Sequence, residues 1–309
     1  MSASRVVSGP VVVTVGSFDG VHLGHRRVLE EIAQRARRAE RRSVLVTFEP
    51  HPLEIVNPAA APPLLTVPAE RREILAQSDL DLVLLLRFTD ELSHYSPEQF
   101  IRLLMAQLDV RELVIGEDHG FGRGRTGDVA LLRQLGRELG FTVDLVEPVR
   151  VDGRPVSSSL IRRAVAGGDL AAAQRLLGRP YSMAGQVVAG AGRGRRVGYR
   201  TINLKPPDHR KLLPPDGVYA VQVEWGRQSA GGMMHLGPRP TFGEHERSLE
   251  VHLLDLDAGL YGIEVKLAWV SRLRDVMQFP SAEALKRQLD NDFAAARAAL
   301  TRFGAPASH

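Results

Sequence analysis

The chain of 309 residues contains no cysteine, few aromatic residues and no long apolar run. The absence of cysteine excludes disulfide bonds and thiolate metal ligands. No apolar stretch approaches the ~20 residues that a membrane helix requires. The first residues, MSASRVVSGP, also lack the apolar core of a signal peptide. These absences favour a cytoplasmic protein without a membrane partner.

The chain is mildly basic, with a formal net charge of +4 and an isoelectric point of about 9.7. The densest positive cluster, RARRAERR, runs from Arg35 to Arg42 and resembles a solvated helix end, where cations suit the helix dipole. No aromatic residue lies within this cluster, and no nucleic-acid-binding motif is present. We therefore expect no nucleic-acid partner. The excess of arginine suits small phosphorylated ligands, and the sequence leaves the oligomeric state open.

The first half of the chain alternates between strand-like runs and helical patterns. The runs are almost continuously apolar, which is typical of strands covered on both faces. They lie at residues 11–16, 43–48, 82–88, 112–116 and 142–147, and the helical patterns at 23–40, 68–77, 97–108, 127–139, 159–166 and 169–177. Repeated alternation of strand and helix predicts an α/β domain with a parallel sheet.

The residues after 181 follow a different pattern, because glycine and proline become frequent and the strand candidates alternate between apolar and polar positions. Residues 217–225, 249–256 and 263–270 alternate in this way, which predicts an antiparallel sheet or small barrel. One amphipathic helix follows, with Ser281 as its cap. We expect two domains, residues 1–182 and 183–309, with the proline-rich loop 57–65 inside the first.

The stretch GSFDGVHLGH, residues 16–25, directly follows the first strand-like run. Ligands of open α/β sheets bind at the carboxyl ends of strands, next to helix N-termini, where free N–H groups attract phosphate. Gly16 and Gly20 allow close approach of the backbone. His22 and His25, three residues apart, share a face of the new helix. We expect the positive helix end to lower their pKa values and keep them largely neutral.

Other interpretations of the histidine pair remain open beside phosphate binding. One is an incidental pair in a plain turn, and another is a metal site with Asp19 as a third ligand, although no further ligand set is evident nearby. A Walker P-loop is excluded, because GKS and GKT are absent.

The same stretch resembles the GxFDGxHxGH signature of nucleotidylyltransferases, and it is most similar to the bacterial bifunctional riboflavin kinase/FAD synthetase family. Later stretches resemble that family's motifs in the same order: TFEPHP (47–52), residues 85–100, VIGEDHGFGRGRTGD (114–128) and residues 156–181. The resemblance implies a Rossmann-like nucleotidylyltransferase domain that transfers AMP from ATP to FMN, giving FAD and pyrophosphate. The phosphate of FMN is already a nucleophile, so this reaction needs positioning and charge stabilisation more than a base.

The resemblance also implies residue roles in this domain. His22, His25 and Arg162 act on the ATP phosphates, and the full ATP site comprises Gly16, Ser17, Phe18, Asp19, His22, His25, Ser157, Ser158 and Arg162. The flavin side comprises Phe48, Pro50, His51 and Asp118. The serines also fit a helix N-cap, and His51 alone fits a structural role equally well. Ser17 stands where the family has Asn, and His119 where it has an aromatic ring; we interpret both as tuning.

The stretch GQVVAGAGRGRRVGYRTINL, residues 185–204, resembles the riboflavin kinase motif. Its glycines, Gly190 and Gly194 among them, let backbone N–H groups reach ATP phosphates. Thr201 and Asn203 supply hard oxygen ligands suited to Mg²⁺. By the same resemblance, Glu250 is the general base that deprotonates the riboflavin 5′-hydroxyl for attack on the γ-phosphate of ATP. Pattern alone fits Glu250 equally well to a solvated strand face.

The resemblance further implies that Arg274 contacts the flavin, although a surface arginine beside a helix is the alternative.

Three residues of this second half depart from the family: Arg200 replaces a proline, Ile202 replaces a small residue beside the metal ligands, and His235 replaces an asparagine. We still expect an active kinase, in a riboflavin-kinase β-barrel with a terminal helix. An enzyme with a weakened or inactive kinase domain and a non-catalytic flavin-binding regulator are the alternatives. The small-molecule substrates are ATP, riboflavin and FMN.

Overall fold

The computed structural model describes residues 7–116, 129–189, 201–206, 208–239, 244–256 and 260–304. The chain divides into two compact units, residues 1–63 with 71–157 and residues 64–70 with 158–309. This division differs from a single boundary after residue 182, because the short segment 64–70 and the helices after residue 157 cluster with the C-terminal strands. Within the described residues, no helix has both the length and the apolar character needed to cross a membrane.

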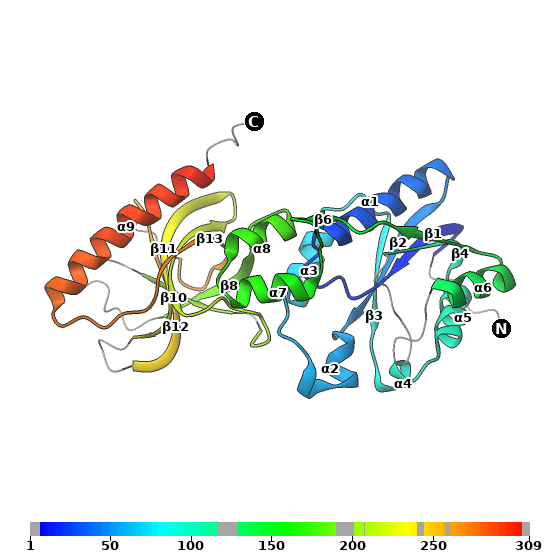
Figure 1. The fold of residues 1–309 in the computed structure, drawn as a ribbon, viewed down its shortest axis with the longest axis horizontal. Helices are drawn as coiled ribbons and strands as arrows, with labels where there is room; N and C mark the ends of the chain where they lie inside the picture. The colour runs from blue at the N-terminus through cyan, green and yellow to red at the C-terminus, as the bar shows by residue number, and fades with distance from the viewer. Residues whose placement is uncertain are drawn as a thin grey trace. The chain divides into compact units, whose positions relative to one another are not determined.

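The first unit is built on a parallel sheet of five strands in the order β3-β2-β1-β4-β5 (Figure 1). The strands are β1 (Pro10–Val15), β2 (Arg42–Glu49), β3 (Leu82–Arg87), β4 (Asp109–Gly116) and β5 (Thr142–Val146). The sheet confirms the predicted α/β architecture. Because the strand order reverses between β1 and β4, a crevice for ligands is expected beyond their carboxyl ends.

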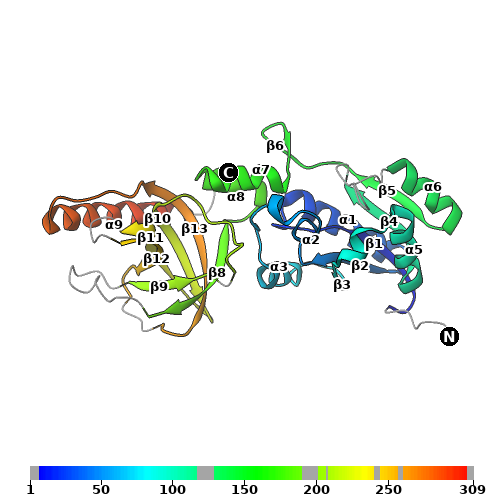
Figure 2. The same cartoon turned by 90° about the horizontal axis from the view of Figure 1, so that it is seen from below.

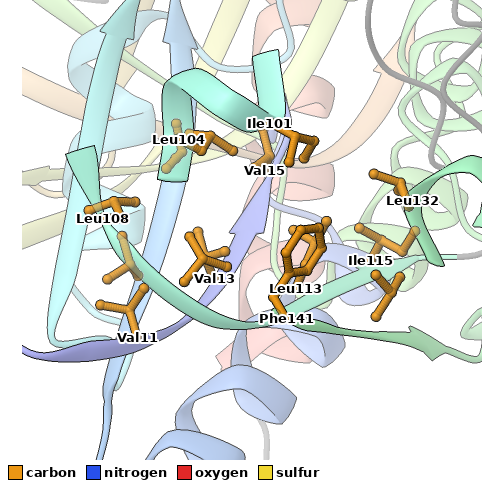
Figure 3. Close-up of a cluster of buried hydrophobic side chains, with 14 of the residues drawn as sticks. Val11, Val13, Val15, Ile101, Leu104, Leu108, Leu113, Ile115, Leu132 and Phe141 are labelled. Carbon is orange, nitrogen blue, oxygen red and sulfur yellow. The ribbon is translucent and has the colours of Figure 1, made fainter. Parts of the chain in front are cut away.

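Helices cover both faces of this sheet. The helices of this unit are α1 (Leu23–Arg38), α2 (Pro52–Val56), η1 (Pro58–Ala60), α3 (Pro68–Leu75), α4 (Asp90–Ser93), α5 (Pro97–Gln107) and α6 (Val129–Leu139), and a small hairpin, β6 (Arg150–Val151) and β7 (Arg154–Pro155), follows. Val11, Val13 and Val15 of β1 pack with α5 and α6 on one face (Figure 3), whereas Val12 packs with α1 on the other. Burial on both faces explains why β1 reads as a continuous run of apolar residues.

The second unit contains a closed barrel in the order β10-β11-β12-β9-β8-β13, and every pair of neighbouring strands is antiparallel. The strands are β8 (Ser182–Val188), β9 (Ile202–Lys205), β10 (Gly217–Trp225), β11 (Gln228–Arg239), β12 (Glu244–Leu253) and β13 (Glu264–Arg274). The predicted barrel is therefore confirmed.

Three helices belong to the barrel unit: α7 (Ser158–Ala166), α8 (Leu170–Leu177) and α9 (Ala282–Gly304). Helix α9 is the predicted terminal helix, and the Ser281 hydroxyl accepts a hydrogen bond from the amide of Ala284 at 3.2 Å. It lies against β10 and β11 (Figure 2), where Ala296 and Ala299 pack with Val218 and Met233.

Segment 64–70 joins the barrel unit through a buried lysine. The Lys211 ammonium donates to the carbonyls of Leu65 (2.7 Å) and Ser182 (2.6 Å) and to Glu70 Oε2 (2.7 Å). Its three N–H groups are matched by three acceptors, and the ring of Tyr181 lies 4.6 Å from the nitrogen. Part of the loop expected inside the first domain thus packs on the barrel.

Candidate active sites

Three residues of the turn between β1 and α1 adopt the left-handed backbone conformation. Phe18, Gly20 and Val21 have φ values of 49°, 84° and 36°, a conformation that is costly for residues other than glycine. Phe18 and Val21 are nevertheless buried in the core between the sheet and α1, which holds them there. The turn brings the start of α1 to the carboxyl end of β1, at the switch point of the sheet.

The two histidines of this turn stack on each other. Their ring centroids lie 3.6 Å apart with an interplanar angle of 15°, and the Phe18 ring lies 4.6 Å from that of His25. His22 caps α1, because its Nδ1 accepts a hydrogen bond from the His25 amide at 3.2 Å. A side chain at Gly24 would come within 3.2 Å of the His22 ring, so glycine leaves room for this arrangement.

Burial keeps His25 neutral. The pKa of His25 lies well below its usual value, first because burial disfavours the charged ring and second because His22 is close. The direction agrees with the expectation from sequence, but burial, rather than the helix end, is the main cause. His25 Nδ1 is buried without a hydrogen-bond partner among the described residues. A stacked pair at a helix N-terminus can donate hydrogen bonds to phosphate, and His25 does so without bringing a fixed charge.

The carbonyl of Ser17 in the same turn accepts hydrogen bonds from two side chains. Thr47 Oγ1 donates at 3.2 Å and Arg71 Nη1 at 3.0 Å, while Arg71 Nη2 donates to the carbonyl of Phe48 at 2.8 Å. Sequence reasoning missed both donors. Thr47 lies within a recognised motif, but Arg71 is one of two adjacent arginines on a predicted helix, and no local signal separates it from its neighbour.

The predicted flavin side begins where β2 ends. The Phe48 ring packs edge-on against Phe88, with centroids 5.4 Å apart. Pro50 follows, half-buried, and His51 caps α2: its Nδ1 accepts from the Leu53 amide at 3.3 Å while Glu54 accepts from the His51 amide. His51 therefore has a structural role, and its contact with flavin stays a prediction. Asp118 and His119 lie outside the described residues.

The proposed phosphate-binding residues Ser157, Ser158 and Arg162 are divided between the two units. Ser157 is the last residue of the first unit's range, whereas Ser158 opens α7 and Arg162 lies one turn further along it in the second unit. Ser158 and Arg162, four residues apart, share a face of this helix. Their closure on the ATP phosphates stays a prediction.

In the barrel, three polar residues form one row across neighbouring strands. Glu250 on β12 pairs in register with His235 on β11 and with Asn203 on β9. Directly paired residues have Cβ atoms about 4.5–5.5 Å apart on the same face, so Glu250 and Asn203 are brought together. Ile202 pairs with Val251 instead, and successive residues of a strand point to opposite faces. Ile202 therefore lies on the face away from Asn203 and does not crowd it.

The structure describes only some of the other residues predicted for the kinase site. Thr201 is described and directly precedes β9, whereas Gly190, Gly194 and Arg200 lie outside the described residues. His235 Nε2 lies 3.0 Å from the carbonyl of Pro238.

Arg274 is engaged with α9. It donates to both carboxylate oxygens of the buried Asp292, with distances of 2.9 and 2.6 Å, and to the carbonyl of Asp275 at 2.8 Å. This bidentate pair attaches α9 to the end of β13. Direct contact of Arg274 with flavin stays a prediction.

Comparisons with known proteins match the two parts of the chain to two different family models. The family model described as FAD synthetase matches residues 5–160, and the model described as riboflavin kinase matches residues 177–300. A solved structure described as a macrolide-efflux protein from Streptococcus pneumoniae has a TM-score of 0.84 and 31% sequence identity, and the match covers 95% of each chain. The same pair of folds therefore occurs in a single chain elsewhere.

Curated relatives match along almost the whole chain, and all carry the name bifunctional riboflavin kinase/FMN adenylyltransferase. The relative from Pseudomonas fluorescens is 39% identical over 96% of this chain and 94% of its own. The Escherichia coli (strain K12) relative is 38% identical over 93% and 91%, and the Haemophilus influenzae relative is 34% identical over 96% of each. With both folds and both family matches in place, this chain belongs to the family of bifunctional riboflavin kinases/FMN adenylyltransferases.

Proposed function

We infer that the chain catalyses two successive ATP-dependent reactions: phosphorylation of riboflavin to FMN by its C-terminal part, and adenylylation of FMN to FAD by its N-terminal part. The observation that carries this inference is the stacked histidine pair at the switch point of a parallel sheet, in a chain that also aligns Glu250 with Asn203 on a barrel. Each group lies within the residues matched by the corresponding family.

In the adenylyl transfer, an oxygen of the FMN phosphate attacks the α-phosphorus of ATP and pyrophosphate leaves. No proton has to be removed from the nucleophile, so the site works by positioning and by stabilising charge. We place the triphosphate at the turn of residues 16–19 and at His22 and His25. The flavin lies on the side of Phe48, Pro50, His51 and Asp118.

In the kinase reaction, the 5′-hydroxyl of riboflavin attacks the γ-phosphorus of ATP and ADP leaves. Glu250 takes the proton of the hydroxyl as general base. By the family resemblance, we assign Gly190 and Gly194 to ATP phosphate binding and Arg274 to the flavin end of the site. Asn203 lies beside Glu250, and we assign its amide oxygen to the cation that accompanies the nucleotide.

The donor chemistry of this row fits Mg²⁺. The described residues contain no group of three or more His, Cys, Asp or Glu side chains that could hold a metal ion by themselves. Mg²⁺ does not need such a group, because it keeps several waters and is bound by few protein oxygens together with substrate phosphates. Thr201 and Asn203 would hold it, and it would neutralise charge on the phosphates of ATP.

The two alternatives are less well supported. A non-catalytic flavin-binding regulator does not require a glutamate paired with an asparagine on neighbouring strands. A chain with an inactive kinase is disfavoured because the riboflavin kinase family match is present and Ile202 does not face Asn203. We place the boundary between the two enzyme domains after residue 182 and the enzyme in the cytoplasm, where ATP is available to both reactions.

A direct assay tests the proposal. Purified protein is incubated with Mg²⁺ and ATP and with either riboflavin or FMN, and the flavins are resolved by chromatography. We expect FMN and then FAD from riboflavin, and FAD from FMN. Conversion of FMN alone would show that only the adenylyltransferase works, and no conversion in either reaction would refute the enzymatic function.

A further inference from the structure

Arg71 is a buried arginine that connects two separate motifs of the adenylyltransferase part. It lies on α3, and its side chain is only 4% exposed. One arm of the guanidinium, Nη1, donates to the Ser17 carbonyl at 3.0 Å, and the other, Nη2, donates to the Phe48 carbonyl at 2.8 Å. Ser17 belongs to the turn that carries the histidine pair, and Phe48 begins the proposed flavin side. The two motifs are about thirty residues apart in sequence, and one planar group holds a backbone carbonyl in each.

Burying this guanidinium has an energetic cost. Desolvation lowers the pKa of Arg71, and the negative charges of Asp19 and Glu49 oppose that shift. The closest carboxylate oxygen, Glu49 Oε2, is 4.0 Å from Nη2, and Arg71 Nε is buried without a hydrogen-bond partner among the described residues. An apolar side chain of similar size would fill this position without the desolvation cost. What an apolar side chain cannot do is bind two carbonyls at a fixed separation.

We propose that Arg71 is a positioning residue for adenylyl transfer, which sets the distance between the triphosphate-binding turn and the flavin-binding segment. The reaction requires an FMN phosphate oxygen in line with the α-phosphorus of ATP, so the separation of the two binding segments controls the reactive geometry. A planar, two-armed donor holds that separation, whereas a lysine is a point charge on a flexible stem. Arg71 itself touches neither substrate; it acts through Ser17 and Phe48. This inference rests on the proposed adenylyltransferase site.

Two variants of Arg71 and one matched control test the proposal in the full-length protein. Arg71→Lys keeps the charge but loses the fork, and Arg71→Ala removes both. The control is Arg72→Ala, because Arg72 is the next residue of the same helix and its pair with Glu49, at 3.1 Å, is half exposed. For each protein, kcat and KM are measured for FAD formation from FMN and, separately, for FMN formation from riboflavin.

For both Arg71 variants we expect kcat/KM for FAD formation to fall by ~10- to 100-fold, the size of effect that a small misplacement of reacting groups produces. The kcat for FAD formation falls as well as the affinity, while FMN formation stays close to wild type. Added guanidinium ion restores part of the FAD formation of Arg71→Ala. It leaves the FAD formation of Arg72→Ala unchanged. Rescue by guanidinium would show that the planar donor itself, and not its covalent link to α3, is what FAD formation requires.

Three results would overturn the proposal: FAD formation within about twofold of wild type in both Arg71 variants, parallel loss of FAD and FMN formation, or loss of FAD formation that guanidinium does not restore. A parallel measurement on His25→Ala separates this failure from failure of the proposed site. If His25→Ala forms FAD normally, the site itself is misplaced. If His25→Ala is impaired and the Arg71 variants are not, only the positioning role of Arg71 is wrong.

Discussion

Glu250 and His25 occupy environments that suit opposite tasks. Glu250 is half-buried on a strand face beside Asn203 and His235, and its proposed task is to take a proton and then release it. His25 is enclosed by His22 and Phe18 and stays neutral because charging it would cost desolvation. Each environment leads to a test that changes one residue.

The first prediction concerns Glu250→Gln, which keeps the size of the side chain and removes the base. We expect FMN formation from riboflavin to fall by ~10²- to 10⁴-fold, the usual contribution of a positioned base. FAD formation from FMN should not change, because its nucleophile is already ionised. Chromatography of the products from each substrate measures both rates. An equal loss of the two activities would contradict the assignment of Glu250 to the kinase.

The second prediction concerns the dependence of stability on pH through His25. In the unfolded chain this histidine titrates near 6.5, and in the folded protein its pKa is lower. Between the two values the unfolded chain binds one more proton, so the free energy of unfolding decreases as the pH falls through this window, by at most about 1.4 kcal/mol per pH unit. Above pH 6.5 the contribution of His25 is constant.

The measurement for His25 compares urea unfolding of the wild type and of His25→Gln, followed by circular dichroism, at about pH 7.5 and about pH 5.5. Glutamine cannot titrate, so the variant should lose less stability than the wild type between the two conditions. The same pH dependence in both proteins would mean that His25 is charged in the fold.

At the scale of elements, α9 is held to the barrel by apolar contacts and by one buried ion pair. Ala296 and Ala299 pack with β10 and β11, and Arg274 and Asp292 form the bidentate pair described above, with side-chain exposures of 16% and 4%. A buried pair adds little net stability when intact, but breaking it leaves an uncompensated charge. The pair therefore fixes where α9 sits more than it stabilises the unit.

The third prediction follows from this pair. Asp292→Asn should lower the free energy of unfolding of the barrel unit by about 3–5 kcal/mol, because Arg274 stays buried without its counter-charge. The chain has two tryptophans, Trp225 and Trp269, and both lie in the barrel, so their fluorescence during urea unfolding reports on this unit.

The control for Asp292 is Asp255→Asn. Asp255 pairs with Arg297 of α9, but both side chains are more than half exposed. Exposed pairs contribute under about 1 kcal/mol. Asp255 has a φ of 60°, a conformation that asparagine tolerates. If both substitutions have the same small effect, the Arg274–Asp292 pair does not hold α9.

At the scale of the whole molecule, segment 64–70 shows that each compact unit is built from two separate stretches of the chain. Lys211 is 1% exposed and its partner Glu70 7%, and Glu70 also accepts from the amides of Val67 (3.1 Å) and Ala184 (2.9 Å). A buried, fully matched polar cluster of this kind commits its members to one arrangement. Residues 64–70 are therefore part of the barrel's structure although they lie between helices of the first unit in sequence.

The fourth prediction is that Lys211→Met destabilises the barrel unit by about 3–5 kcal/mol, because the carboxylate of Glu70 remains buried without its partner. Lys286→Met is the matched control, since Lys286 pairs with Asp290 on the exposed face of α9 and should change stability by less than about 1 kcal/mol. Tryptophan fluorescence during urea unfolding measures both. Equal midpoints for the two variants would show that segment 64–70 is not held by Lys211.

Much of the fold and part of the site could be predicted from local signals. The strands and longer helices follow from periodicity, the cap at Ser281 from residue type, and the phosphate-binding turn from glycines and histidines between a strand and a helix. Helices α2 and α4 were missed, because four or five residues are too few for a periodic pattern. Arg71 and Lys211 were missed for a different reason: each resembles the exposed basic residues around it until its burial is known.

The sequence by itself therefore determined the two fold classes, the order of the elements and the family, because turn chemistry, periodicity and ordered motifs are properties of short stretches. The tertiary structure alone decided which side chains bind the Ser17 carbonyl, which residues share a row with Glu250, and which segment completes the barrel. These contacts join residues far apart in the chain, and they depend on burial and on strand register. Both quantities exist only once the chain has packed.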